Sequence, residues 1–97
     1  STWHSEKYLK FIRSLPCVVT RTKSNEDDRD PVVAHHLINY GEGKLGGKSH
    51  DLFAFPIRAS KHKELHDNIK NWEELNGSQL LHVKNTISKA LQLGAIE

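Results

Sequence analysis

Two groups of histidines carry the side chains in this sequence that are best suited to chemistry. His35 and His36 are adjacent at the end of the apolar run "VVAHH", and His62 and His66 lie four residues apart in "HKELH". Residues four apart share one face of a helix, so these two imidazoles can reach a single ion. Together with His35 they supply three nitrogen ligands and leave a position open, which is typical of a catalytic metal site.

His36 is the candidate general base beside that ion. Successive side chains of a strand point to opposite faces, so His36 would lie next to the metal without binding it. Asp51 could hydrogen-bond His36 and fix its tautomer. A base that activates water, next to a metal that stabilises charge on phosphate, favours hydrolysis of a phosphodiester.

The spacing of "HKELH" also invites comparison with the H-E-x-x-H motif of metalloproteases. In this chain the glutamate is Glu64, two residues after His62, so it points to another side of the helix. The protease interpretation therefore lacks its general base.

Composition limits the other classes of function. The chain has 97 residues, 36% of them apolar, and a net charge of +2, so we expect one domain and only a mild preference for anions. The single cysteine, Cys17, excludes an internal disulfide framework and a Cys-rich zinc finger. No apolar run reaches membrane-spanning length and no segment has the order of a signal peptide, so the cytoplasm is the expected compartment.

The elements that must position the histidines follow from periodicity and from capping residues. The first helix is predicted to start at a Ser5 cap and to end at Pro16, and a last helix to start at a Ser78 cap, burying Leu80, Val83 and Leu91 among others. Strands are predicted over 31–38 and 51–57, the second ended by Pro56, followed by a helix over 58–69. Residues 17–20 form a short strand or an extended stretch, 21–30 an exposed charged loop, and 70–77 a continuation of the helix or a short turn.

The order of these residues resembles that of the HNH nucleases, also called ββα-metal or His-Me finger nucleases. The pattern "AHHL…G…HDLF…P…H…LH" is most similar to a prophage-encoded family of HNH nucleases, over roughly residues 14 to 96. It is similar, more distantly, to the phage recombination-enhancement nuclease, which depends on a recombinase, and to the colicin DNases.

The resemblance implies a role for each matching residue. His35 would be a metal ligand, His36 the general base and His62 the ligand on the helix, with His66 a third ligand or a support for it. Asp51 lies nearest the place of the asparagine that orients the base. Its spacing to His62 is slightly longer than in the colicin group, so His50 competes for that role.

One departure concerns a second metal. Relatives often carry a structural zinc on two pairs of Cys or His residues, and the corresponding positions here are Cys17, Thr20, Arg58 and Lys61. We therefore expect no structural zinc, with packing in its place, and one divalent ion at the catalytic histidines: zinc, nickel, magnesium or manganese.

Basic residues near the histidines are candidates for binding the DNA backbone. Lys44 and Lys48 lie in the glycine-rich stretch between the strands, and Arg58, Lys61 and Lys63 lie at the start of the following helix.

The sequence thus predicts one α+β domain over residues 1–97, with a ββα-metal core at about 31–70 flanked by an N-terminal and a C-terminal helix. Its predicted function is metal-dependent cleavage of DNA in phage or prophage recombination or repair. The expected partners are DNA and a recombinase or another phage recombination protein, in the cytoplasm of a bacterial host and away from membranes. Two alternatives are a non-catalytic DNA- or protein-binding module that uses its metal for stability, and a metal-free recombination accessory factor.

Overall fold

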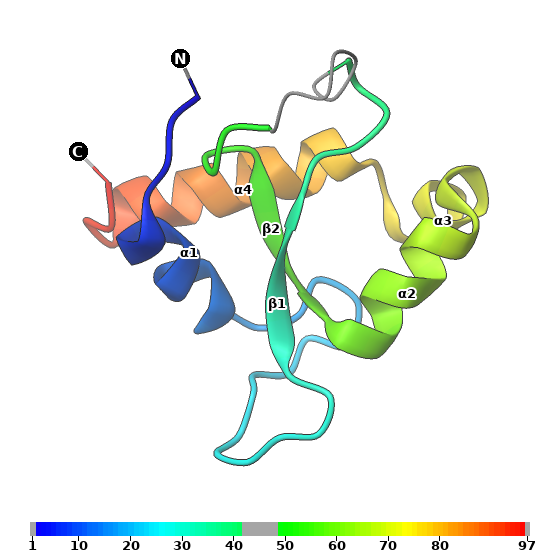
Figure 1. Ribbon diagram of the computed structural model, residues 1–97, viewed down its shortest axis with the longest axis horizontal. Helices are drawn as coiled ribbons and strands as arrows, with labels where there is room; N and C mark the ends of the chain where they lie inside the picture. Colours follow the sequence, from blue (N-terminus) through cyan, green and yellow to red (C-terminus); the bar gives the residue numbers. More distant parts are fainter. Residues whose placement is uncertain (1, 42–48, 97) are drawn as a thin grey trace.

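Two strands and four helices form the part of the chain that the computed structural model describes, residues 2–41 and 49–96 (Figure 1). The elements are α1 (Glu6–Arg13), β1 (Val32–His36), β2 (Ala54–Arg58), α2 (Ala59–Asp67), α3 (Ile69–Asn76) and α4 (Gln79–Gln92). The class is α+β, with one small antiparallel sheet. Within the described ranges no helix is long and apolar enough to cross a membrane.

The sheet pairs β1 with β2, so that His35 lies opposite Phe55 and Ala34 opposite Pro56. The prediction that Pro56 ends the second strand is wrong, because the strand continues to Arg58. The Pro56 carbonyl accepts a hydrogen bond from the Val18 N–H at 3.0 Å, on the side away from β1. In an antiparallel strand the nitrogen and oxygen of one residue face the same side, so the proline removes no bond of the ladder.

Residues 18–20 form a turn, which corrects the expected strand or extended stretch. The buried Cys17 Sγ accepts hydrogen bonds from the Val19 N–H at 3.3 Å and from the Thr20 N–H at 3.4 Å. This local side-chain acceptor offers the backbone an alternative to a sheet ladder. The Arg58 N–H donates to the same sulfur at 3.4 Å and ties the turn to β2.

The core has two parts, and α4 contributes to both. One contains Phe55, Ile57, Leu65 and Trp72 with Val83 of α4, and the other contains Tyr8, Ile12 and Ala54 with Ala90 of α4. Figure 1 shows α4 running across the two strands, with α1 near its C-terminal end. The sheet is therefore held between α1 on one side and α2 and α3 on the other.

The helix caps are read correctly from sequence in two of three cases. The Ser5 and Ser78 hydroxyls accept the Tyr8 and Leu81 N–H groups, as predicted. The third cap is Asn68, whose side chain accepts the Asn71 N–H at 3.0 Å and starts α3 as a separate helix. The extended backbone of Asn68 separates α3 from α2, so the predicted continuation of the preceding helix and the predicted short turn are both wrong.

The apolar face of α4 differs from the predicted one at its two ends. Leu80 and Leu91 are 49% and 58% exposed, so their predicted burial is wrong. Gln79 and Thr86 are buried instead. The predicted burial of Val83 and Ala90 is confirmed. Hydrophobic periodicity therefore placed the centre of the buried face correctly, but it cannot identify buried polar positions.

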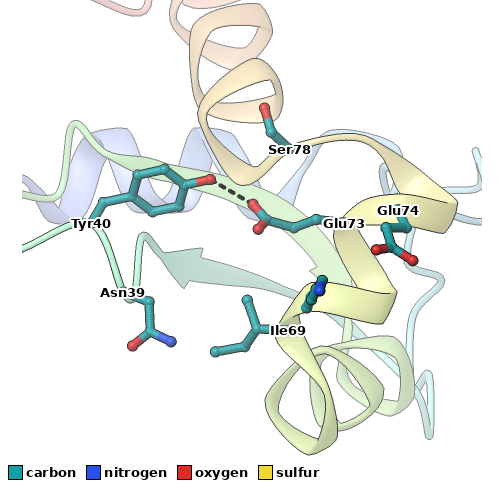
Figure 2. Close-up of a pocket in the computed structure, with 7 residues that line it drawn as sticks. Asn39, Tyr40, Ile69, Glu73, Glu74 and Ser78 are labelled. Carbon is teal, nitrogen blue, oxygen red and sulfur yellow. Dashed lines mark hydrogen bonds between the residues drawn. The ribbon is translucent and has the colours of Figure 1, made fainter.

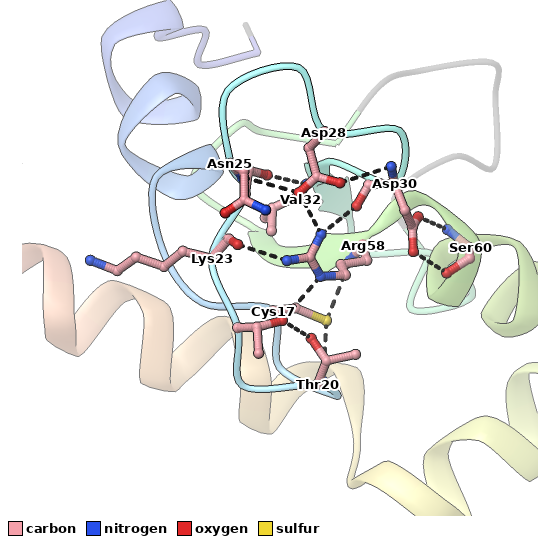
Figure 3. Close-up of polar contacts among 11 residues, drawn as sticks. Cys17, Thr20, Lys23, Asn25, Asp28, Asp30, Val32, Arg58 and Ser60 are labelled. Atoms are coloured by element: carbon pink, nitrogen blue, oxygen red, sulfur yellow. Dashed lines mark hydrogen bonds and ion pairs between the residues drawn. The ribbon is translucent and has the colours of Figure 1, made fainter.

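Arg58 is the centre of a polar network that joins β2 to the loop over 22–31 (Figure 3). Its Nη1 donates to Asp28 Oδ2 at 2.9 Å and its Nη2 to the Lys23 carbonyl at 2.7 Å. Its Nε donates to Thr22 Oγ1 at 3.1 Å. The hydrogen bond from Arg58 lowers the pKa of Asp28 to about 2. The loop was predicted only to be exposed, but Asp28 binds Arg58 at the end of β2 and Asp30 binds Ser60 at the start of α2.

Asp30 fixes the first turn of α2. Its carboxylate accepts the Ser60 N–H at 2.7 Å and the Ser60 hydroxyl at 2.6 Å, and the Ala59 N–H donates to the Pro31 carbonyl at 2.9 Å. A carboxylate at this end of a helix satisfies N–H groups that have no intrahelical partner. The direction in which α2 leaves the sheet is set by these contacts.

We expect Arg58→Met to lower the melting temperature by more than about 5 °C, because Asp28 and the carbonyls of Lys23 and Asp30 lose their donor together. The matched control is Arg13→Met, which removes the exposed pair between Arg13 and Glu6 and should change the melting temperature by less than about 2 °C. Thermal unfolding followed by circular dichroism measures both changes in melting temperature. Equal changes would show that the Arg58 network stabilises the fold no more than an exposed ion pair does.

Candidate metal centre

The imidazoles of His35, His62 and His66 come together between β1 and α2. Their candidate ligand nitrogens all lie within 4.8 Å of one another. The ring centroid of His35 is 4.8 Å from that of His62 and 5.5 Å from that of His66. Because α2 begins directly after β2, which pairs with β1, its first two turns carry His62 and His66 back over His35.

The three rings are arranged so that they could hold one metal ion. Tetrahedral zinc with Zn–N bonds of about 2.0 Å holds its ligand atoms about 3.3 Å apart. His62 Nε2 and His66 Nε2 are 2.9 Å apart, so these two nitrogens lie at a separation close to that of two ligands of one ion. His35 is 1% exposed, whereas His66 is exposed. The site therefore has a buried wall and an open side.

Burial keeps two of these rings in the form that binds metal. Burial lowers the pKa of His35 to about 4, against the opposing effect of its hydrogen bond with Gln79. Burial, and secondly the charge of His66, lower the pKa of His62. Metal ions bind the neutral imidazole, so neither ring needs to lose a proton to a metal at neutral pH.

His36, the residue after His35, forms a hydrogen-bonded pair with Asp51. His36 Nε2 lies 2.8 Å from Asp51 Oδ1. Burial by itself raises the pKa of Asp51, but hydrogen bonds from His36 and from the Ser5 N–H outweigh it and the net shift is downward. Asp51 is therefore a carboxylate at neutral pH and can only accept, so the proton in this contact belongs to His36 Nε2.

The N-terminal segment holds Asp51 in place, a role that sequence reasoning missed. The Ser5 N–H donates to Asp51 Oδ2 at 2.8 Å, and the Asp51 N–H donates to the Trp3 carbonyl at 3.0 Å. His50 instead accepts the Trp3 N–H through Nδ1 at 2.7 Å. Of the two competitors, Asp51 is thus the one that contacts His36. His4, left outside the site by sequence reasoning, has its Nδ1 3.9 Å from Asp51 Oδ2.

Gln79 is the second residue that the sequence did not indicate. It is fully buried and its Oε1 lies 2.9 Å from His35 Nε2. Nothing in the pattern points to it, because a polar residue at the first position of a helix is ordinary.

The basic residues predicted to bind DNA have different surroundings. Lys61 and Lys63 are paired along the exposed surface of α2 with Glu64 at 3.0 Å and Asp67 at 3.1 Å. The contacts that occupy the Arg58 guanidinium argue against the DNA contact predicted for it. Lys44 and Lys48 lie outside the described residues.

The chain was also compared with known proteins. Residues 1–94 match the model of the family described as "Protein of unknown function (DUF968)". The chain belongs to this family. It is 36% identical over 94 residues to the uncharacterized protein YdfU of Escherichia coli (strain K12), an alignment that covers 97% of this chain and 25% of YdfU. The chain thus spans about a quarter of the length of that relative. No solved structure matches.

The low pKa of His35 predicts how stability changes with pH in the metal-free protein. The unfolded chain binds a proton at this ring near its ordinary pKa of 6.5, while the folded protein does so only near 4. The stabilisation is therefore complete above pH 6.5 and is lost as the pH falls toward 4, by on the order of 3 kcal/mol from His35 alone. His62 and His82, whose pKa values are also lowered by burial, act in the same direction.

Urea unfolding between pH 7.5 and 4.5 in the presence of a chelator measures this loss. His35→Gln keeps a donor for Gln79 but does not titrate, so its free energy of unfolding should fall less steeply over the same range. An unchanged slope in this variant would contradict the burial of a neutral His35.

Proposed function

We propose that the chain is a metal-dependent endonuclease domain that hydrolyses DNA phosphodiester bonds, with β1, β2 and α2 as a ββα-metal core. The observation that carries this proposal is the pairing of two features at one strand end. Three histidines that can hold an ion include His35, and the next residue, His36, is hydrogen-bonded to a carboxylate. Phosphodiester hydrolysis needs both an electrophilic centre and a base.

The three proposed ligands differ in burial, and the difference suits them to different roles. When bound by His35, His62 and His66, a divalent ion supplies stabilisation of the negative charge that develops on the phosphate and on the leaving oxygen. The buried position of His35 anchors the set to the sheet, while the exposed His66 faces the side from which a phosphate can approach.

His36 is suited to take the proton from the attacking water. Because its Nε2–H is donated to the Asp51 carboxylate, its Nδ1 carries the free lone pair. The side chain is 37% exposed, so water reaches it. Asp51 holds the ring in one orientation and stabilises the imidazolium that forms when Nδ1 accepts the proton.

DNA would contact the exposed surface of α2. The ion pairs of Lys61 and Lys63 are at the surface, where such pairs are weak, so phosphates can replace Glu64 and Asp67 as partners. The setting in phage or prophage recombination or repair, a recombinase partner and a bacterial cytoplasm are parts of the proposal that rest on the sequence resemblance.

Nicking of supercoiled plasmid by the purified chain tests the proposal, with magnesium, manganese, nickel and zinc added separately and bound metal assayed on the same samples. We expect His36→Ala to slow cutting by about 10²–10⁴-fold while metal stays bound, because only the base is lost. His62→Ala should lose both metal and cutting.

Other outcomes separate the alternative functions. A parent chain that binds metal but cuts neither duplex, single-stranded nor branched DNA would support a binding module. A parent chain that binds no metal would support a metal-free accessory factor. Cutting that survives His36→Ala would contradict the assigned base.

Substitution next to the base distinguishes Asp51 from its neighbour. Asp51→Ala removes the acceptor of His36 and is expected to slow cutting by about 10–10²-fold without loss of metal. His50→Ala removes the contacts of this ring with the Trp3 N–H and the Phe53 ring, neither of which involves His36, and should cut at nearly the parent rate. The reverse order of effects would assign the orienting role to His50.

A further inference from the structure

The fully buried side chain of Gln79 makes hydrogen bonds to two residues that are distant from it in sequence. Its side chain bridges His35, on β1, and the backbone of Ile38, just beyond β1. A buried amide of this kind is costly unless each of its groups is satisfied, and here both ends of the amide have partners.

The two contacts with Ile38 fix which way the amide points. The Ile38 N–H donates to Gln79 Oε1 at 3.2 Å, and Gln79 Nε2 donates to the Ile38 carbonyl at 3.0 Å. A flipped amide would place two donors against each other and two acceptors against each other, so only this orientation is satisfied. The atom that faces His35 is therefore an oxygen.

An oxygen at that place decides where the proton of His35 lies. Gln79 Oε1 can only accept, and His35 Nε2 lies 2.9 Å from it, so Nε2 must carry the hydrogen. The lone pair of the neutral ring is then on Nδ1. The nitrogen that a ring keeps for a metal is set by the hydrogen bond that its other nitrogen makes.

The backbone of Gln79 is held as firmly as its side chain. Its N–H donates to Glu73 Oε2 at 2.8 Å, and the Tyr40 hydroxyl donates to the same oxygen at 2.7 Å. Figure 2 shows Tyr40 and Glu73 meeting at the rim of a shallow hollow between the segment after β1 and α3. Gln79 thus has little freedom to move away from His35.

We propose that Gln79 is a positioning residue that holds His35 in the tautomer protonated at Nε2 and so makes Nδ1 its metal-binding atom. The inference rests on the proposed metal site for its consequence, but the tautomer itself is a property of the metal-free protein. Because Gln79 lies 44 residues from His35 in sequence, it links α4 to the ligand set on β1 and α2.

Long-range proton–nitrogen correlation spectra of ¹⁵N-histidine-labelled protein, freed of metal, measure the tautomer directly. The parent should show His35 protonated at Nε2 only. Gln79→Leu, which removes the acceptor, should give a mixture of tautomers. If Gln79→Leu does not fold, Gln79→Met replaces it with an unbranched side chain. Gln92→Leu, at the exposed end of the same helix, is the matched control and should match the parent.

Zinc titration by calorimetry tests the consequence separately. Gln79→Leu should bind zinc about 10–100-fold more weakly than the parent, with Gln92→Leu near the parent value. A parent His35 protonated at Nδ1, or a single Nε2–H tautomer that persists in Gln79→Leu, would overturn the role of Gln79. A parent with the expected tautomer that binds no zinc would overturn the metal site and leave the tautomer assignment standing.

Discussion

Strand β2 becomes helix α2 between Arg58 and Ala59 with no linker, and the geometry of the candidate site depends on this junction. Asp30 satisfies the first turn of α2, while the Arg58 side chain is held by Asp28 and by backbone carbonyls of the preceding loop. A helix attached to a strand without spare residues has little freedom of direction. The positions of His62 and His66 over His35 are therefore consequences of how the loop before β1 folds back on the end of β2.

The alternation of β1 divides the candidate site between the two sides of the sheet. His35 faces α2 and Gln79, whereas His36 faces Asp51 and the segment that leads into α1. Each histidine thus has its own partner, and each partner is an oxygen that accepts from Nε2. In the proposed function the same arrangement serves two purposes, because it would leave a nitrogen of one ring for an ion and a nitrogen of the other ring for a proton.

Three of the buried polar side chains lie at the candidate site. Gln79, Asp51 and His35 are all buried, and each has hydrogen-bonding partners from distant parts of the chain. In a domain of this size such contacts add little net stability compared with apolar packing, but they restrict the side chains to one arrangement. On the His35 side, Phe55, Leu65 and Trp72 belong to an apolar cluster, and the Phe55 ring packs edge-on against His35.

The sequence by itself determined the features that depend on a few neighbouring residues. The serine caps, the apolar strand that ends in two histidines and the spacing that brings His62 and His66 onto one helix face all follow from local hydrogen bonding and periodicity. Only the tertiary structure decided that Asp51 rather than His50 contacts His36, that Arg58 turns inward, and that Gln79 reaches His35. These contacts join residues 15 positions apart for His36 and Asp51, 30 apart for Asp28 and Arg58, and 44 apart for His35 and Gln79. No local pattern encodes them, because they exist only once distant parts of the chain have packed together.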